Sequence, residues 1–342
     1  MAATTYSFFD AALVTEIERE RAIKLEETSA LARVLPLVDE NTDAVLWDKR
    51  DNVRGLLPVG GRNDDFPVLN AEGVERLAMA PGHFHGTKKL DADRIARGAR
   101  PGALGDVIDV NMEIGELQRE LQVMGLSVRD ACRGKLLTLG QAAVPDKDGK
   151  MRTTAIWGDY NSRYAALAGG DKWDAPTTAK PYKNIREWFS YYEGSGHFYN
   201  SQAIILMSRI TANKMVLCDE VRNYRDKYGA TIQSVNALNE LIDREGDMPL
   251  IVPVEDGYLD ESGNFQPYIA NGYAVIVGYN PMYGIKAGDF VLTRNSDKLG
   301  QVGIYAETDF NPNPPKLPRT HHSFSGGPRI NYHKQIQVIK VY

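Results

Sequence analysis

The chain has few cysteines and no long apolar run. Its two cysteines, Cys132 and Cys218, have no second cysteine at metal-ligand spacing, so the sequence encodes neither a disulfide framework nor a zinc knuckle. Such cysteine usage suits a reducing cytosol. No segment approaches the roughly 20 apolar residues of a membrane span, and the N-terminus lacks a basic region followed by an apolar one. We therefore expect neither export nor membrane insertion.

Positive charge is also scarce. The 40 lysines and arginines are outnumbered by 45 acidic residues, which gives a formal net charge of -5 at pH 7. A surface that grips nucleic acid needs clustered Lys and Arg to neutralise phosphates, so this balance argues against such a surface. Any nucleic-acid partner would be contained or repelled. With 342 residues and 43% hydrophobic content, the chain is long enough for two domains around separate cores.

Signatures of nucleotide and acyl-transfer chemistry are missing. No G-x-x-x-x-G-K-S/T phosphate cradle occurs, and no G-x-G-x-x-G opens a helix after a strand. The Gly194–His197 segment lacks the G-x-S-x-G spacing of a nucleophile turn. Asp256, Asp260 and Glu261 do not fit the twelve-residue calcium loop, and the sequence DESG is ordinary turn chemistry. We assign no catalytic residue.

A histidine pair is the candidate metal site. His83 and His85 are separated by one residue in a strand-like run, so they point to one face and could bind zinc with His197, His321 or His322. An isolated H-x-H pair is more often exposed than metal-bound, and a loop setting gives ligands no rigid support. We expect no metal and no cofactor. A metal-dependent hydrolase that uses His83 and His85 is kept as an alternative function.

What the chain does contain is a long helical pattern. The apolar spacing predicts one helix over residues 105–138, roughly 50 Å long at 1.5 Å per residue. Charged residues on the other side predict a solvent-facing surface, and three glycines favour close packing of another backbone. A coiled coil is the alternative, but the stripe is short for one. The stripe is Val110, Ile114, Leu117, Leu121, Met124, Val128 and Ala131; the charged side is Glu113, Glu116, Arg119, Glu120, Arg129 and Arg133; the glycines are Gly115, Gly125 and Gly134.

The segments before this helix are too polar and too broken to form a core of their own. Residues 7–21 predict an amphipathic helix followed by short extended pieces, which we interpret as an arm and not as part of a core. Residues 48–93 alternate strand-like runs with Gly and Pro. A loop of that length needs a partner to lie upon.

After the long helix the sequence predicts a hairpin and then a compact second domain. The order of these elements is mixed α+β. The last residues, YHKQIQVIKVY, alternate as a strand that we expect to return to the first domain. The expected elements are a hairpin turn at Asp146–Gly149, helices over 184–192 and 210–228, a helix N-capped by Thr231, buried strands at 203–207 and 273–279, and a second hairpin with its tip at Asp260–Gly263.

The succession of these segments resembles the major capsid protein of lambda-like tailed phages, the E family. The motifs that carry the resemblance are the loop at Pro81–Gly82 followed by KKLDAD, the long helix, the DGK hairpin and the stretch DESGNFQPYIANGYAVIVG. The resemblance implies the Hong Kong 97-type capsid fold. It would consist of an N-terminal arm (1–47), an extended loop or E-loop (48–89), a peripheral domain with the spine helix (90–182), an axial domain (183–318) and a C-terminal return strand to the peripheral domain (319–342).

The resemblance implies a major capsid protein that assembles itself into the icosahedral head of a tailed phage. Hexamers and pentamers of one chain would enclose double-stranded DNA without sequence-specific binding, in a virion assembled in the host cytoplasm. A cement protein, a scaffolding protein and a portal are implied as partners, and no covalent crosslink or membrane contact is expected. An encapsulin-like nanocompartment shell is the alternative within the same fold.

The extended loop is the expected clamp on a neighbouring subunit. Exposed ion pairs contribute only about 0 to 1 kcal/mol each, so such a clamp depends on many repeated contacts. The candidate inter-subunit contacts are Arg76, His83, His85, Lys88, Lys89 and Arg94.

Overall fold

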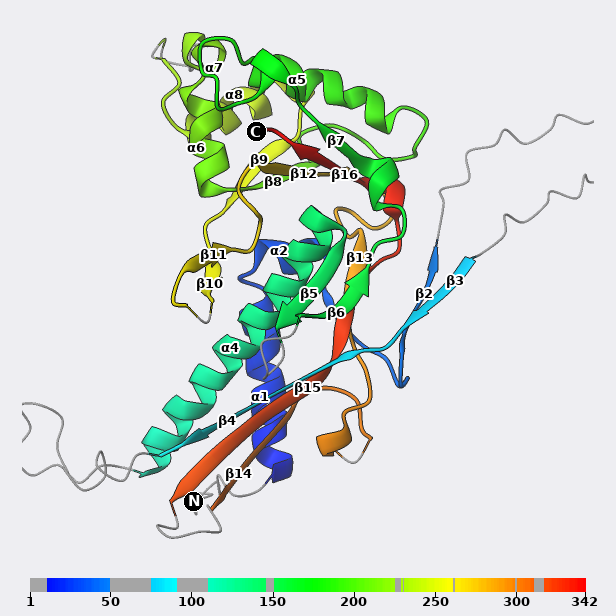
Figure 1. The fold of residues 1–342 in the computed structure, drawn as a ribbon, viewed down its shortest axis with the longest axis vertical. Coiled ribbons are helices and arrows are strands. Elements are labelled where there is room, and N and C mark those ends of the chain that lie inside the picture. Colours follow the sequence, from blue (N-terminus) through cyan, green and yellow to red (C-terminus); the bar gives the residue numbers. More distant parts are fainter. Residues whose placement is uncertain are drawn as a thin grey trace, which may run out of the picture.

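The computed structural model describes residues 11–49, 75–90, 110–145, 151–224, 229, 231–260, 262–298, 300–310 and 317–342. Two bodies stand one above the other in Figure 1, each built on a five-stranded sheet. We call them the lower body and the upper body. The lower body contains α1 (Ala11–Glu26), α2 (Ala30–Val34), β1 (Leu37–Asp39), β4 (Gly82–Lys89), α4 (Val110–Leu139), β5 (Gln141–Pro145), β6 (Met151–Ile156), β13 (Gly288–Leu292), β14 (Tyr305–Phe310) and β15 (Pro318–Ile330).

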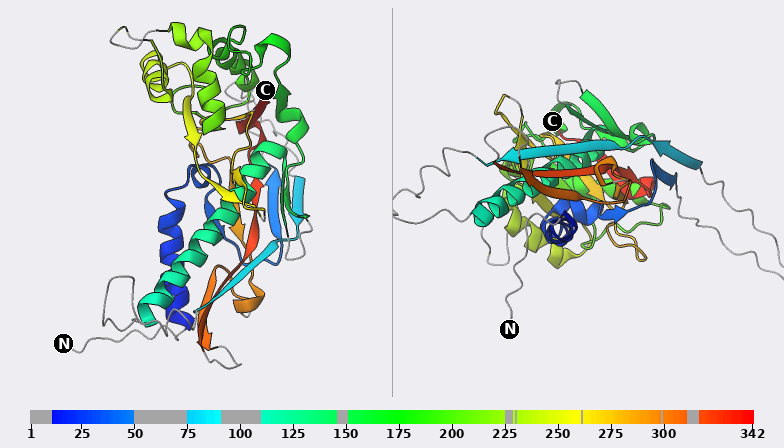
Figure 2. Two further views of the ribbon diagram at one scale, coloured as in Figure 1. Left: turned by 60° about the vertical axis from the view of Figure 1, so that its left-hand side comes forward. Right: turned by 90° about the horizontal axis from the view of Figure 1, so that it is seen from below.

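The lower sheet is organised around β15. This strand pairs antiparallel with β13, β14 and β4, and β1 adds to β13 in parallel. Eight residue pairs join β4 to β15, from Gly82↔Gly326 to Arg319↔Lys89. The long helix α4 lies across this sheet beside α1, and it contacts both β15 and β4 (Figure 2). The predicted spine helix is confirmed, although residues 105–109 lie outside the described part.

The upper body is a sheet covered by short helices. Its strand order is β7-β16-β12-β8-β9, in which β8–β9 and β7–β16 are parallel pairs. The elements are β7 (Tyr164–Ala166), α5 (Pro181–Glu187), the 3-10 helix η3 (Trp188–Tyr192), β8 (Ile204–Ser208), α6 (Arg209–Leu217), α7 (Asp219–Asn223), α8 (Val235–Glu245), β9 (Leu250–Val254), β12 (Tyr273–Val277) and β16 (Ile336–Lys340).

The upper sheet separates two hydrophobic cores. Alternate residues of β8, such as Ile204 and Leu206, pack into the core of the lower body, while Ile205 and Met207 pack against the upper helices. Because both faces of β8 and β12 are buried, these strands are continuous apolar runs in the sequence. That pattern was the correct basis for predicting them as buried strands.

Two hairpins lie outside the main sheets. The strands β5 and β6 pair antiparallel as predicted, and their turn, residues 146–150, lies outside the described residues. The second hairpin joins β10 (Gly257–Leu259) to β11 (Phe265–Pro267). Its tip is held by Asp260, whose side chain accepts from the amides of Ser262 and Asn264 at 3.0 and 2.9 Å. The interpretation of this tip as a turn is confirmed.

The N-terminal segment contributes to the hydrophobic core. Its interpretation as an arm that is not part of a core was therefore wrong. Leu31, Val34 and Leu35 are at most 1% exposed and join the same cluster as Leu137 of α4 and Phe290 of β13. The short helix α2 begins at an N-cap, Ser29, that accepts from the amide of residue 32. The sequence pattern failed here because this segment buries its apolar residues against distant elements and not against itself.

The charged side of the spine helix was predicted wrongly in part, since Arg119 and Glu120 are exposed as expected but three other members are buried. Arg129 and Arg133 are 1% and 0% exposed, and Glu113 is buried, whereas Met124 of the apolar stripe is 56% exposed. The reason is that α1 covers a second side of α4. Two of the three helix glycines are closely packed. At one of them, Gly134, a Cβ would lie 1.9 Å from the carbonyl oxygen of Tyr268. The exception is Gly115, which faces open space.

Three further boundaries differ from the sequence prediction. The helix expected over 210–228 is two helices, because the backbone is extended at Cys218 and the amide of Asp219 donates to the carbonyl of Pro176. The third helix starts at Ser234 and not at Thr231. The C-terminal segment is divided. Its first half, β15, lies in the lower sheet as expected for 319–342, but β16 is in the upper sheet between β7 and β12, so the last strand does not return to the first domain.

No helix in the described part of the chain combines the length and the apolar character needed to cross a membrane.

Candidate assembly surface

A two-stranded arm projects from the lower body. The strands β2 (Val45–Lys49) and β3 (Glu75–Met79) pair antiparallel and point away from both sheets (Figure 1). Arg76 lies on β3 opposite Asp48. Residues 50–74, which connect the two strands, lie outside the described residues. The predicted extended loop therefore starts as a projecting ribbon, but its last eight residues belong to β4 in the lower sheet.

The alternation of β4 divides its side chains between two environments. Phe84 packs against Phe324 of β15, with ring centroids 5.0 Å apart, and Lys88 forms an ion pair with Glu120 of α4. These side chains face the spine helix. His83 and His85 lie on the opposite face and are exposed, as the H-x-H spacing predicts. Lys88 is thus engaged by its own chain, while Lys89 is exposed and Arg94 lies outside the described residues.

The two histidines stack on each other and contact their own chain. Their ring centroids are 5.4 Å apart. The Nδ1 atom of His83 lies 2.8 Å from Ser325 Oγ, and its Nε2 lies 3.3 Å from a carboxylate oxygen of Asp297. Among the residues that the structure describes, no group of three or more His, Cys, Asp or Glu side chains could hold a metal ion. The pair is not joined by His197 or His322, which are buried elsewhere.

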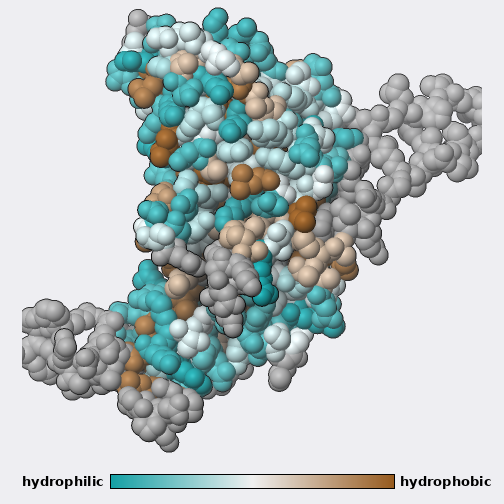
Figure 3. All heavy atoms as spheres, in the orientation of Figure 1, coloured by the Kyte–Doolittle hydropathy of each residue, from teal (hydrophilic) through white to brown (hydrophobic). Residues whose placement is uncertain are grey.

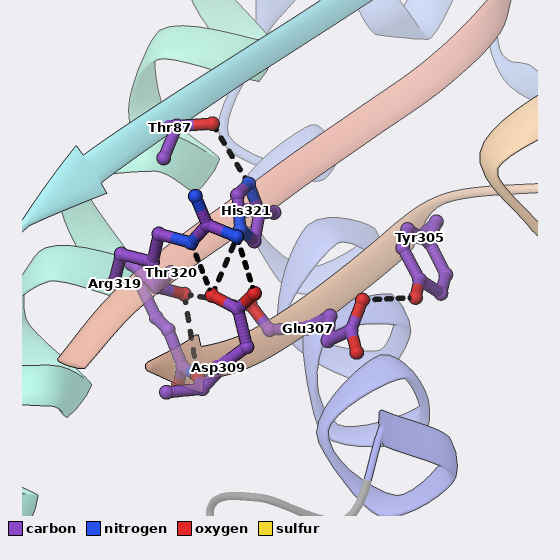
Figure 4. A network of polar contacts seen from close by, with 9 residues as sticks. Thr87, Tyr305, Glu307, Asp309, Arg319, Thr320 and His321 are labelled. Atoms are coloured by element: carbon purple, nitrogen blue, oxygen red, sulfur yellow. Dashed lines mark hydrogen bonds and ion pairs between the residues drawn. The ribbon is translucent and has the colours of Figure 1, made fainter. Parts of the chain in front are cut away.

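A polar network continues from this face to β14 (Figure 4). Asp309 accepts hydrogen bonds from Arg319 at 2.5 and 2.6 Å, and His321 Nε2 lies 3.1 Å from the same carboxylate. The hydrogen bond from Arg319 holds the pKa of the Asp309 carboxyl below its usual range. His321 Nδ1 in turn lies 2.8 Å from the hydroxyl of Thr87 on β4. The network therefore links β14, β15 and β4, and only His321 among its members was considered from the sequence.

A buried ionic cluster joins α1 to the spine helix. Arg129 Nε donates to Glu26 at 2.6 Å, Arg133 Nη2 lies 2.6 Å from the other Glu26 oxygen, and Arg133 Nη1 donates to Asp130 at 2.7 Å. The guanidinium carbons of Arg129 and Arg133 lie 5.2 Å from the ring centroids of two phenylalanines of the lower sheet. The cluster could not be recognised from the sequence, because Glu26 is 103 residues from Arg129.

Burial and charge act against each other in this cluster. Burial alone would raise the pKa of Glu26, but the positive charges of Arg133 and Arg129 lower it below its ordinary value of 4.5. At Asp130 burial prevails over the attraction of Arg133 and raises the pKa. Glu26 is therefore the carboxylate whose negative charge compensates the buried positive charges of both arginines.

Cys132, Cys218 and Ser195 do not have the surroundings of an activated nucleophile. Burial raises the pKa of both thiols, Cys132 and Cys218, to about 11, so neither is a thiolate at neutral pH. The hydroxyl of Ser195 donates to the carbonyl of Tyr192 at 2.8 Å within a turn, which confirms that this segment is a loop. The space-filling view in Figure 3 shows a mostly hydrophilic face on which apolar groups are scattered among polar ones.

Comparison with known proteins gives the family and the fold. The family model described as phage major capsid protein E matches residues 38–287. The structures that it resembles include a protein assigned as the capsid protein of an E. coli CFT073 prophage, with a TM-score of 0.63, 13% identity, and coverage of 97% of this chain and 99% of that chain. A search of curated protein sequences finds no match.

Two further structures are similar over nearly the whole chain. A phage-related protein from Bordetella bronchiseptica RB50 has a TM-score of 0.55 at 12% identity and covers 94% of this chain and 96% of that chain. A chain of the satellite phage P4 procapsid that includes the size determination protein has a TM-score of 0.54 at 9% identity, with 100% and 92% coverage. The fold is thus the Hong Kong 97-type capsid fold, and neither the nanocompartment nor the hydrolase alternative is favoured. Because the family match extends over most of its length, this chain belongs to the phage major capsid protein E family and is a capsid-forming protein of the virion.

Proposed function

We propose that this protein is a non-enzymatic shell subunit that forms hexamers and pentamers and closes them into an icosahedral head around double-stranded DNA. The observation that carries the proposal is the match of residues 38–287 to a major capsid family. Closed shells require one surface to serve several non-identical contacts, and a projecting ribbon such as β2–β3 suits that requirement. The net charge of -5 would let DNA move against the wall without adhering.

In this proposal the bodies have different positions in the shell. The upper body is the axial domain around the capsomer axes, and the lower body is the peripheral domain. Their bounds differ from the expected 183–318 and 90–182, because β13 and β14 lie in the lower sheet and β7 lies in the upper sheet. The ribbon β2–β3, with the residues that it carries, is the clamp on a neighbouring subunit. Arg76, His83, His85, Lys89 and Arg94 stay candidate contacts for that neighbour.

The proposed partners follow from the same role. A separate scaffolding protein, a cement protein and a portal would act with the subunit, and assembly would take place in the host cytoplasm before the head becomes part of the virion. The DNA would be enclosed without sequence-specific contacts. No catalytic residue is assigned.

The test replaces the tip of the ribbon and leaves both sheets intact. Residues 50–74 are exchanged for a two-residue Asn-Gly turn between Lys49 and Glu75, which face each other across β2 and β3. A longer deletion reaching residue 86 would remove five of the eight residues of β4 and disturb the lower sheet. We expect a folded subunit that no longer forms shells when it is expressed alone or with neighbouring genes, as seen by electron microscopy and light scattering.

The matched control is Leu259→Ser, which changes an exposed residue of the β10–β11 hairpin, outside the ribbon. It should form the same particles as the wild type. Normal particles from the ribbon variant would disprove the clamp, and a wild-type protein that stays monomeric under every condition would disprove the shell role itself.

A further inference from the structure

Large apolar side chains are exposed along one edge of the upper body. Met282 is 81% exposed, and four aromatic residues of its own and two adjoining segments are between 37% and 50% exposed. Monomeric proteins rarely expose aromatic side chains together, and such groups are typical of the centres of protein interfaces. We call this set the aromatic edge: Phe189, Tyr191, Phe198, Met282 and Tyr283.

The three segments of the aromatic edge are held together. The amide of Phe198 donates to the carbonyl of Tyr279 at 2.7 Å, and the reverse bond is 2.9 Å. The ring of Phe189 packs edge-on against Tyr199, with centroids 6.1 Å apart. The turn that presents Met282 is closed by backbone bonds between Asn280 and Gly284. The edge is therefore preorganised, which lowers the entropic cost of binding.

A second apolar strip lies on the other side of the upper body. Ile210 and Leu217 of α6 are 53% and 57% exposed, and their spacing of seven residues places them on one helix face. In Figure 1, α6 is at the left of the upper body, whereas the helical segment from α5 into η3 runs to the right. Figure 3 shows apolar groups at the surface on the α6 side. We call this strip the α6 edge: Ile210, Asn213 and Leu217, with Arg222 of the adjoining α7.

The two edges also carry charges of opposite sign. Glu193 follows η3 on the aromatic edge and is exposed, and Arg222 is exposed beside the α6 edge. Within the described part of the chain, neither side chain forms an ion pair. A contact between the two edges would bring these charges together and would set the orientation of the neighbouring copies.

We propose that the aromatic edge of one copy packs against the α6 edge of the next, in a head-to-tail contact oriented by Glu193 and Arg222. A contact between two different patches closes into a ring when the rotation between copies allows it. The occupant is a second copy because both complementary surfaces are on this chain and because capsid-forming proteins associate with themselves. The inference depends on the proposed shell function, since it names the surfaces that this self-association uses.

The first test uses charge reversal at exposed positions, which leaves the fold intact. Glu193→Arg and Arg222→Glu are each expected to lower the yield of shells or rings by about tenfold, because like charges then face each other. The double variant should restore assembly, since the pair is reversed as a whole. Single variants that assemble like the wild type, or a double variant without rescue, would overturn the proposal.

The second test distinguishes a head-to-tail contact from a symmetric one. Phe198→Asp disables the aromatic edge, and Leu217→Asp disables the α6 edge, so neither variant alone should form rings. Each still has one intact edge, so a mixture should yield dimers in analytical ultracentrifugation. A mixture that stays monomeric would contradict the pairing. The control Leu259→Asp, outside both edges, should assemble normally, and a wild type that fails to assemble would reject the shell function and not these surfaces alone.

Discussion

The lower and upper bodies bury different chemistry. Every buried Asp, Glu, Lys or Arg among the described residues lies in the lower body: Glu26, Glu113, Arg129, Asp130 and Arg133. The core of the upper body is apolar and aromatic, and its buried polar residues include no Asp, Glu, Lys or Arg. The upper body is therefore stabilised by hydrophobic burial that any well-packed apolar set could supply. The lower body depends on one ionic arrangement that brings α1 to a defined position on α4.

The largest expected effect comes from removing the central carboxylate of that arrangement. Glu26→Gln leaves Arg129 and Arg133 buried without their shared partner and should destabilise the lower body by about 3–5 kcal/mol. Hydrogen exchange measured by mass spectrometry should rise in α1, α4 and β15, with little change in α5–α8. The control Glu27→Gln alters the exposed neighbour and should have almost no effect. Equal loss of protection in both bodies would remove the contrast between them.

Acid should expose the same difference without a mutation. Because the folded-state pKa of Glu26 lies below its ordinary value of 4.5, its contribution is complete above that pH and is lost as the pH falls through the lower, folded-state pKa. The raised pKa of Asp130 acts in the opposite direction and offsets part of the loss. Hydrogen exchange followed from neutral pH downwards, corrected for intrinsic rates, should show α1 opening before the upper helices. Glu26→Gln should show a shallower pH dependence, and an unchanged one would contradict this assignment.

A smaller effect is expected where the spine helix meets the β10–β11 hairpin. Gly134→Ala would place a methyl group 1.9 Å from the backbone oxygen of Tyr268, so the helix or the hairpin must shift, at a cost of about 1–3 kcal/mol. Gly115→Ala on the same helix meets open space and should stabilise it by up to about 1 kcal/mol. Thermal melting of both variants tests this directly. If Gly134→Ala left the melting temperature unchanged, the helix and the hairpin would be able to move apart at little cost.

The smallest effect should distinguish the observed start of α8 from the predicted one. The hydroxyl of Ser234 accepts from the amide of Ala237 at 3.2 Å, so Ser234→Ala should cost about 1 kcal/mol. Thr231→Ala should change the melting temperature little, because Thr231 precedes the helix. The opposite ranking of the two variants would show that the helix begins earlier than described here.

The sequence was most informative where a residue's environment is set by its own element. The spine helix was predicted from its periodicity, the two hairpins from their turn residues and the buried strands β8 and β12 from continuous apolar runs, while the family motifs gave the fold. His83 and His85 were correctly placed on one face because strand alternation is local. Ser195 was correctly assigned to a loop for the same reason.

The errors concern positions whose environment depends on distant segments. Arg129 and Arg133 have the spacing of a solvent-facing helix side, and they are buried because α1 and the lower sheet both pack against that side. The strand β16 alternates like any half-exposed strand, but nothing in its residues states which sheet receives it. Asp309 and Arg319 form a close pair across β14 and β15 that has no local signal.

The pairing of β4 with β15 also determines how the subunit would respond to force. Hydrogen bonds in an antiparallel ladder run perpendicular to the strands, so a pull along β4 stretches all of its bonds at once, whereas a pull across it opens them one by one. The ribbon β2–β3 precedes β4 directly in the chain, at Met79 and Gly82. Tension that reaches the ribbon along the direction of β4 is thus shared by eight residue pairs. The pairing of β4 with β15 therefore resists a pull along the strands far better than a pull that peels β4 away from β15.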